Sequence, residues 1–330
     1  MRERGTSVSS TDLHVAATAV AEACAVARRV QDEVVRAGES VTKDDRSPVT
    51  VADLAVQLLV TLRLARDLPG DALLAEESAA VFGDAPEMVD RVLEVVSVVV
   101  DGLTREDLLD ALAGSDATTG RRRWVLDPVD GTKGFLRGDQ YAIALALIEG
   151  DEVVAGVLGC PNLPAPDGGE AGFLFLAERG AGAFHRSLAD GREARARVDE
   201  VREPAEAVVC ESVESGHAAH SEQAEIARRL GIGRPPYRID SQCKYAVLAR
   251  GEASVYLRLP SKKGYREKVW DHAAGSIVIE EAGGRVTDLD GNRLQLARGV
   301  HVANPPGIVA TNGHIHDEVL AAARAVLGRP

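Results

Sequence analysis

Apolar residues recur at helical spacing along several long segments of the chain. An Ala- and Val-rich amphipathic pattern covers about residues 11–37, and a second helical pattern begins near Thr50. Side chains spaced three and four residues apart share one face of a helix, so both segments are predicted to be helical. Residues 79–120 carry a mixed helix and loop pattern. The other predicted helices are 220–230, 244–248, 271–282 and 315–327.

Short apolar runs bounded by turn residues predict strands. In the first half of the chain they are 71–75, 123–126, 141–148, 153–158, 173–177 and 182–185. In the second half they are 207–210, 237–239, 253–257 and 307–310, and they alternate with helices. We therefore expect an α+β N-terminal domain, residues 1–200, followed by an α/β C-terminal domain, residues 201–330.

Composition narrows the class of protein. A chain of 330 residues exceeds the usual size of a single core. The four cysteines form no C-x-x-C pair, which argues against a zinc site or a disulfide framework and fits a reducing cytoplasm. No signal peptide or membrane-spanning run is recognisable. The net charge of −13 disfavours nucleic acid and anionic membrane as partners, so an anionic substrate would need cations or a basic patch beside it.

The strongest chemical signal is the segment Trp124-Val-Leu-Asp-Pro-Val-Asp-Gly-Thr132. Asp127 and Asp130 flank Pro128, whose ring fixes its own φ and keeps the preceding residue extended. We expect the strand to end here in a sharp turn, with both carboxylates and the Val129 carbonyl converging on one point. Such oxygen ligands are those that Mg²⁺ takes. The alternative is a type I turn with Asp at its corners.

Gly131 and Thr132 follow this turn. Their backbone N–H groups would be exposed where a helix begins, which suits a phosphate. A run of three arginines, 121–123, is interpreted as solvated charge.

Four further acidic residues, in three segments, each have a structural explanation besides a chemical one. Glu76 and Glu77 follow a predicted strand and could be surface residues. Asp271 opens a predicted helix and could be its N-cap. Asp53 lies three residues after Thr50, which matches a capping box.

Together, these segments resemble the inositol monophosphatase superfamily. The matching stretches, in order, are Ser47-Pro-Val-Thr-Val-Ala-Asp53, Ala75-Glu-Glu-Ser78, Trp124 to Thr132 and Trp270-Asp-His-Ala-Ala-Gly275. Others are similar to its 3′(2′),5′-bisphosphate nucleotidase branch, namely Lys133-Gly-Phe135, Arg137 to Ala142, Arg238 to Tyr245, Tyr256 to Pro260 and Gly264 to Lys268. One departure is Ala75, where many relatives have Gly.

The resemblance implies a layered αβαβα sandwich, sensitivity to lithium, a role in sulfate assimilation and dependence on Mg²⁺, with two or three ions per site. It also implies that most metal ligands lie in the N-terminal domain. Asp53 and Thr132 would activate the attacking water. The implied metal ligands are Glu76, Asp127, the Val129 carbonyl, Asp130 and Asp271. Two histidines compete for an adenosine contact, and alignment from Cys210-Glu211-Ser212 favours His217 over His220.

Charge reverses locally between residues 234 and 268, where nine Lys and Arg stand against three acids. This suits a second phosphate, bound away from the metal ions by Lys244, Arg258 and Arg266, while Ser241 hydrogen-bonds the nucleotide. A solvated basic face is the alternative. The prediction is hydrolysis of the 3′-phosphate of adenosine 3′,5′-bisphosphate (PAP), with 3′-phosphoadenosine 5′-phosphosulfate (PAPS) as a further substrate.

Other readings of the same chain stay open. The same chemistry could act on inositol monophosphate, inositol polyphosphate 1-phosphate or fructose 1,6-bisphosphate. A catalytically silent nucleotide or metal sensor is disfavoured, because a sensor does not need the water-activating pair Asp53 and Thr132. The sequence leaves monomer and homodimer equally open.

Overall fold

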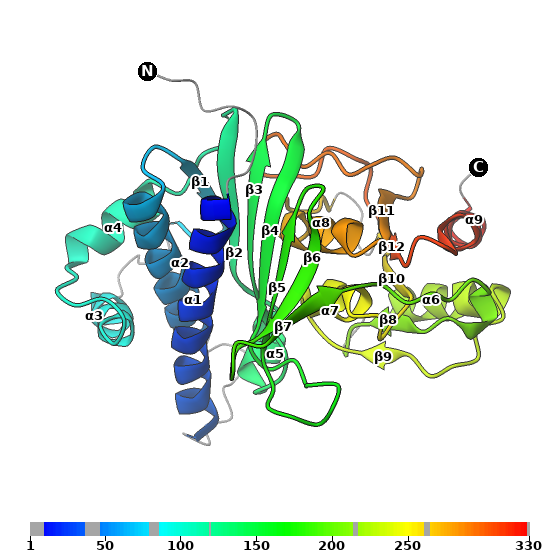
Figure 1. Ribbon diagram of the computed structural model, residues 1–330, viewed down its shortest axis with the longest axis horizontal. Coiled ribbons are helices and arrows are strands. Elements are labelled where there is room, and N and C mark those ends of the chain that lie inside the picture. Colours follow the sequence, from blue (N-terminus) through cyan, green and yellow to red (C-terminus); the bar gives the residue numbers. More distant parts are fainter. Residues whose placement is uncertain are drawn as a thin grey trace.

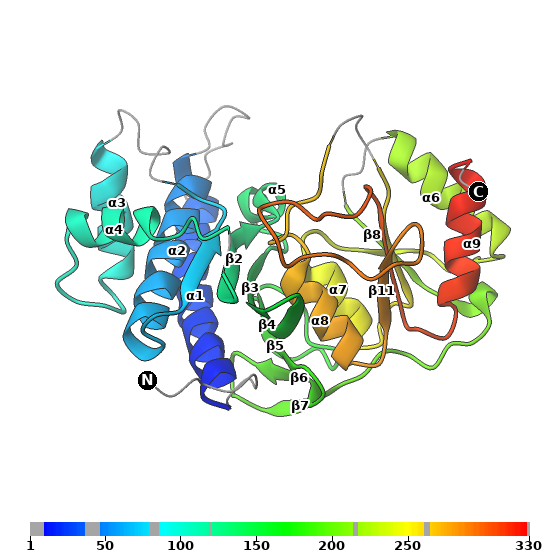
Figure 2. The same cartoon turned by 90° about the horizontal axis from the view of Figure 1, so that it is seen from above.

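The computed structural model describes residues 10–36, 47–78, 86–118, 120–213, 217–260 and 265–328, which form two β-sheets with helices on and between them (Figure 1). Seen from above, the layers succeed one another as helices, sheet, helices, sheet, helices (Figure 2). The predicted αβαβα sandwich is therefore confirmed. No described helix has both the length and the apolar character that a membrane crossing demands.

The first two layers come from the N-terminal part of the chain. Helices α1 (Ser10–Arg36) and α2 (Ser47–Asp67) pack on one face of a seven-stranded sheet. Only β1 and β2 are parallel in it; every later neighbour is antiparallel. Its strands, in spatial order, are β1 (Ala72–Ala75), β2 (Arg122–Asp130), β3 (Ala142–Glu149), β4 (Glu152–Cys160), β5 (Phe173–Glu178), β6 (Gly182–Ser187) and β7 (Glu193–Ala196). The short helices of this part are α3 (Pro86–Val96), α4 (Arg105–Ala113) and α5 (Thr132–Leu136).

The second sheet comes from the C-terminal part and has the order β11-β12-β10-β8-β9. Helices α7 (Cys243–Ala249) and α8 (Ala273–Glu281) lie between the two sheets, and α6 (His217–Arg229) and α9 (His316–Val326) lie outside (Figure 2). The strands are β8 (Val209–Glu211), β9 (Tyr237–Arg238), β10 (Val255–Arg258), β11 (Arg285–Asp288) and β12 (Ile308–Thr311). A 3₁₀ turn, Pro204–Glu206, precedes β8.

Helix α8 is buried along residues 273–279, because sheets or helices cover every side of it. Gly275 allows this close packing. A Cβ there would lie 2.2 Å from the Tyr245 ring, so any larger residue would force α7 and α8 apart.

The structure corrects several local predictions. Strand β2 continues to Asp130 instead of ending before a turn, and β7 and β11 were not predicted. The arginine run is not simply solvated. Arg122 makes ion pairs with acids on three other segments, and Arg123 is 0% exposed, donating to the carbonyls of Ala117 and Gly299. The domain division near residue 200 stays a prediction.

Candidate active site

Strand pairing brings the first two acidic turns together. Ala75 at the end of β1 pairs with Leu126 of the parallel strand β2, and the Glu76 N–H donates to the Leu126 carbonyl at 3.2 Å. Because parallel strands end at the same edge of a sheet, Glu76 and Asp127 become neighbours.

Beyond Asp127, β2 bulges. Asp127 lies opposite Ala144 and Asp130 lies opposite Ala142, so β2 takes three steps where β3 takes two. Pro128, which has no N–H to donate, occupies the irregular stretch. A bulge changes the direction of the side chains that follow it, and here it brings Asp130 to the cavity wall. The type I turn alternative is therefore wrong.

Helix α2 approaches the same edge of the sheet. Asp53 is buried on this helix. One turn later, Gln57 donates from Nε2 to the Glu77 carbonyl at 2.9 Å, and its Oε1 accepts from the Glu77 N–H at 3.2 Å. These two bonds attach the segment after β1 to α2. The side chain of Thr50 lies outside the described residues, so the capping-box alternative for Asp53 stays untested.

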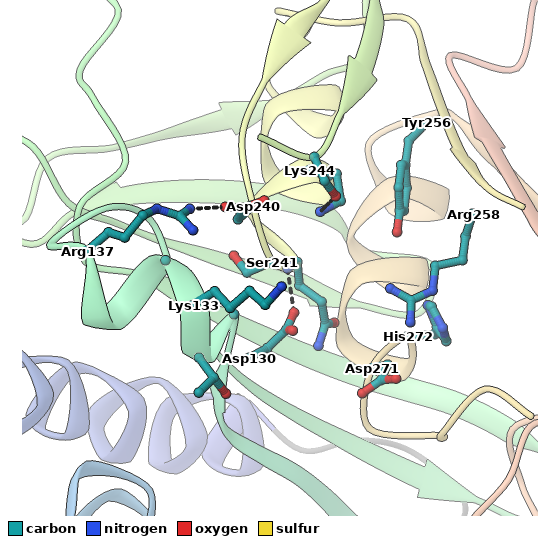
Figure 3. Close-up of a pocket in the computed structure, with 15 residues that line it drawn as sticks. Asp130, Lys133, Arg137, Asp240, Ser241, Lys244, Tyr256, Arg258, Asp271 and His272 are labelled. Carbon is teal, nitrogen blue, oxygen red and sulfur yellow. Dashed lines mark hydrogen bonds and ion pairs between the residues drawn. The ribbon is translucent and has the colours of Figure 1, made fainter. Parts of the chain in front are cut away.

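Asp271 comes from the other half of the chain. It lies in a turn, and α8 starts two residues later with His272 as its N-cap, so the N-cap alternative for Asp271 is wrong. Asp271 and Asp130 line the same cavity, and Figure 3 shows both side chains facing into it. Asp130 is in addition held by the Gln242 N–H, which donates to its Oδ2 at 2.5 Å.

The cavity measures about 240 Å³ and lies between residues of both sequence halves. Figure 3 shows Asp130 and Asp271 at one end of the cavity, here called the acidic end, with Lys133 beside Asp130. Lys244 lies at the opposite end and Arg258 extends from there toward Asp271; these two cations are here called the basic end. The cavity is lined by Asp130, Gly131, Thr132, Lys133, Gly134, Arg137, Ser212, Asp240, Ser241, Gln242, Lys244, Tyr256, Arg258, Asp271 and His272.

The acids perturb one another. Burial raises the pKa of Asp127 well above its ordinary value, and Asp130, Glu76 and Asp271 raise it further. Burial and the nearby acids also raise the pKa of Asp271 to about 6. Glu76 is exposed as a whole residue, yet the protein around its carboxylate and Glu77 raise its pKa to about 7. Like charges crowded in this way favour protonation or a bound cation.

One atom of this cluster lacks any partner. Asp127 Oδ1 is buried and accepts no hydrogen bond from the described residues. An unsatisfied buried carboxylate oxygen is costly unless a cation or a donor meets it. Carboxylates from three separate segments, namely the end of β1, the bulge of β2 and the turn before α8, are the donor set that Mg²⁺ takes, and one of their oxygens has no partner among the described residues, so the residues fit this metal.

The basic end is built on α7 and β10. Lys244 is 4% exposed; its Nζ donates to Ser212 Oγ at 3.2 Å and lies 5.5 Å from the centre of the Tyr256 ring. Burial lowers its pKa. Arg258 donates from Nε to Glu267 Oε2 at 3.1 Å. An anion entering the cavity would thus meet a buried ammonium group and a guanidinium group.

Ser241 has an unusual backbone at the floor of the cavity. Its φ of 64° is the one positive value among the described non-glycine residues. Gly131, with φ of 95°, lies against it, and a Cβ at residue 131 would come within 2.8 Å of the Ser241 Cβ. Only glycine permits this approach of the two segments.

Several predicted site residues do not line the cavity or lie outside the described residues. The Val129 side chain packs in the core, and its carbonyl stays a predicted ligand. Asp53 and Thr132 share no hydrogen bond among the described contacts, so their pairing stays a prediction.

Arg266 does not line the cavity; it donates to the Val302 carbonyl at 3.4 Å. Its segment is held against residues 301 and 302 by a β-bridge and by a bond from the Val302 N–H. The His217 and His220 side chains lie outside the described residues.

Other cavity residues were not predicted as site residues. Lys133, Arg137 and Gln242 belong to stretches that carried the family resemblance, which was the only signal for them. Arg137 forms an ion pair with Asp240 at one side of the cavity, joining the two sequence halves (Figure 3).

A second group of possible ligands lies beside Asp271. Ligand atoms of Glu267, Asp271 and His272 lie within 4.8 Å of one another. However, Arg258 already pairs with Glu267, and the His272 ring is held between Glu267 (3.3 Å) and the Tyr245 hydroxyl (2.9 Å). This group therefore supports the turn that carries Asp271.

Known proteins are similar to this chain over most of its length. Residues 6–327 match the model of the inositol monophosphatase family. A 3′(2′),5′-bisphosphate nucleotidase of Emericella nidulans is 39% identical, over 95% of this chain and 97% of its own. One from Oryza sativa is 42% identical, over 94% of this chain and 93% of its own.

Solved structures share the fold. SuhB of Mycobacterium tuberculosis superposes with a TM-score of 0.63 at 26% identity, covering 96% of this chain and 97% of its own. An inositol monophosphatase from Anabaena gives a TM-score of 0.62 at 22% identity, over 97% and 96%.

Proposed function

The chain belongs to the inositol monophosphatase family, and on this premise we propose that it is a Mg²⁺-dependent phosphomonoesterase that converts PAP to AMP by removing the 3′-phosphate. The observation that carries the proposal is a single cavity lined both by the acids Asp130 and Asp271 and by the cations Lys244 and Arg258. A substrate with two separated phosphates suits both ends. The names of the relatives above support the same substrate class.

At the acidic end, the metal ions would be held by Glu76, Asp127, the Val129 carbonyl, Asp130 and Asp271. When bound, Mg²⁺ neutralises phosphoryl charge and lowers the pKa of a coordinated water.

The protein would supply the remaining groups for the reaction. The backbone N–H groups of Gly131 and Thr132 would orient the phosphoryl group that is cleaved. Thr132 Oγ would take a proton from the attacking water and pass its own to the Asp53 carboxylate. This relay requires the two side chains to come into hydrogen-bond contact when substrate is bound; α2 and α5 already pack against each other.

At the basic end, Lys244 and Arg258 would bind the 5′-phosphate, and Ser241 would hydrogen-bond the nucleotide. Lys244 has no ion pair in the part of the chain that the structure describes, and burial lowers its pKa, so an anion would stabilise its charged form. The 5′-phosphosulfate of PAPS offers similar charge at this position, so we include PAPS as a second substrate. On the basis of alignment alone, His217 would contact the adenosine. Arg266 would assist substrate binding from outside the cavity lining.

The test is phosphate release from PAP, PAPS, 3′-AMP and inositol 1-phosphate, each with Mg²⁺, with EDTA and with Li⁺. We expect PAP to have the highest kcat/KM, an absolute need for Mg²⁺ and inhibition by Li⁺. Faster turnover of inositol 1-phosphate would assign the chain to a sugar phosphatase instead. A protein that binds PAP and releases no phosphate would be the sensor alternative.

A further inference from the structure

Two buried glutamines contact the acidic turns from opposite faces of the seven-stranded sheet. Gln57 lies on α2, and Gln242 immediately precedes α7, on the other side of the sheet (Figure 2). Gln57 is 0% exposed and Gln242 is 2% exposed. Neither was predicted as a site residue.

Each glutamine uses both ends of its amide on backbone groups of a segment that carries a predicted metal ligand. As described above, Gln57 donates to and accepts from Glu77, next to Glu76. Gln242 donates from Nε2 to the Trp270 carbonyl at 2.9 Å and accepts at Oε1 from the Gly275 N–H at 3.2 Å. Those two backbone groups bracket Asp271.

Gln242 also reaches the other half of the site through its backbone. Its N–H donates to Asp130 Oδ2 at 2.5 Å, while its side chain holds the turn of Asp271. One residue thus links a ligand on β2 to a ligand before α8. A displacement of either turn would stretch a bond to the same residue.

We propose that Gln57 and Gln242 are positioning residues for the metal site, holding the backbone beside Glu76 and Asp271 in place so that their carboxylates would hold the bound cations. The physical need is clear: carboxylates that repel one another would separate unless their backbones were fixed. Two bonds in opposite directions to the main chain fix it better than a single bond, and partners outside the ligand set typically change metal affinity tenfold or more. This inference rests on the proposed metal-dependent function.

Gln223 provides a matched control. It is also buried, at 8% exposure, and donates from Nε2 to a backbone carbonyl, that of Leu257, at 2.9 Å. Its Oε1 has no partner among the described residues. It lies on α6, outside the second sheet, and its hydrogen bond among the described residues goes to β10 and not to the backbone beside Glu76 or Asp271. A loss of its amide should therefore affect stability without affecting the metal site.

The experiment compares Gln57→Met, Gln242→Met and Gln223→Met with the unaltered chain. Mg²⁺ binding is measured by calorimetry without nucleotide, and thermal unfolding is followed in EDTA and in Mg²⁺. We expect the apparent Kd for Mg²⁺ to rise about tenfold or more in the first two variants and to stay unchanged in the third. If a Met variant no longer unfolds cooperatively, the neutral variant Gln57→Leu or Gln242→Leu is measured by the same criterion.

Equal Mg²⁺ affinity in all folded variants would overturn the positioning role and leave the proposed function standing. A chain that binds no Mg²⁺ even unaltered would overturn the metal site, and the inference with it. Weakened binding in Gln223→Met to the same extent would show that any buried amide has this effect, and would equally refute the special role of the pair.

Discussion

The acidic and basic ends of the cavity differ in how the protein supports their charges. At the acidic end, Asp127 and Asp130 share one strand. Burial raises the pKa of both carboxyl groups, and the charge of Asp130 raises the pKa of Asp127 further. At the basic end, Lys244 and Arg258 stand on separate elements, and Arg258 already has Glu267 as its partner. The acidic end is therefore incomplete without cations, whereas the basic end is partly compensated. We therefore expect the rate of phosphate release to depend mainly on the acidic end, and the choice of substrate to depend mainly on the basic end.

Asp127→Asn removes the central charge of the acidic end. We expect turnover of PAP with Mg²⁺ to fall about a thousand-fold, roughly 4 kcal/mol of transition-state stabilisation. The metal-free variant should unfold at a higher temperature than the wild type, because repulsion among the acids decreases. Phosphate release and thermal unfolding in EDTA measure the two effects. Turnover at the wild-type rate would mean that the acidic end is not the reacting end.

The acidic end and a buried histidine elsewhere in the fold, His316, should change the stability in opposite directions as the pH falls. His316 lies between Thr287 Oγ1 and Thr311 Oγ1, each 2.9 Å away. Thr287 donates its own proton to the Asp288 carbonyl, so it accepts from His316 Nε2, and Nδ1 is left as an acceptor. Burial, aided by the charge of Arg285, lowers the pKa of His316 to about 4.

A folded pKa below the ordinary value means that the neutral ring stabilises the fold. This contribution is complete above about pH 6.5 and is lost as the pH falls toward 4, at a cost of about 3 kcal/mol. The site carboxylates, whose pKa is raised, act in the opposite direction, because the fold favours their protonated form. Urea unfolding at pH 7 and pH 4 should show a larger loss for the wild type than for His316→Gln. Parallel losses in both proteins would contradict the assignment.

Lys244→Met tests the basic end. Loss of one charge-assisted hydrogen bond to the 5′-phosphate should lower kcat/KM for PAP about 10- to 100-fold. With 3′-AMP, which lacks that phosphate, the change should be small. The ratio of the two kcat/KM values is the quantity to measure. An equal loss on both substrates would place Lys244 at the cleaved phosphate and so cancel the division into two ends.

Arg137→Gln should have the smallest effect. Its ion pairs with Asp139 and Asp240 lie at the partly exposed rim, where such pairs contribute at most about 1 kcal/mol. We expect a two- to threefold rise in KM for PAP at constant kcat. Steady-state kinetics over a range of PAP concentrations give both values. A large fall in kcat would instead show that the link between the two sequence halves is needed for the reaction.

The sequence predicted the carboxylates of the acidic end, but it did not predict the glutamine side chains that hold the backbone beside them. Two carboxylates that lie close together in one short segment, such as Asp127 and Asp130, indicate a cation site by their spacing. The amides of Gln57 and Gln242 acquire a role only from the backbone groups that folding places beside them. No local pattern distinguishes either residue from Gln223.

Local errors in the predicted fold have equally physical causes. Strand β7 was missed because its first three residues are exposed and polar or small, so the alternation that marks a half-buried strand is weak. The start of α8 was placed two residues early because Asp271 is a good N-cap type. In the folded chain, Gln242 takes the Trp270 carbonyl, and the helix starts only after His272.

The contact between Gly275 and the Tyr245 ring limits how this chain can vary. The Tyr245 hydroxyl meets the His272 ring at 2.9 Å, and His272 adjoins Asp271. Adding a single methyl group at residue 275 would push on the ring, and through it on the turn that bears the carboxylate. Mutational tolerance at this position is therefore governed by the chemistry of the site, even though the residue itself touches no substrate.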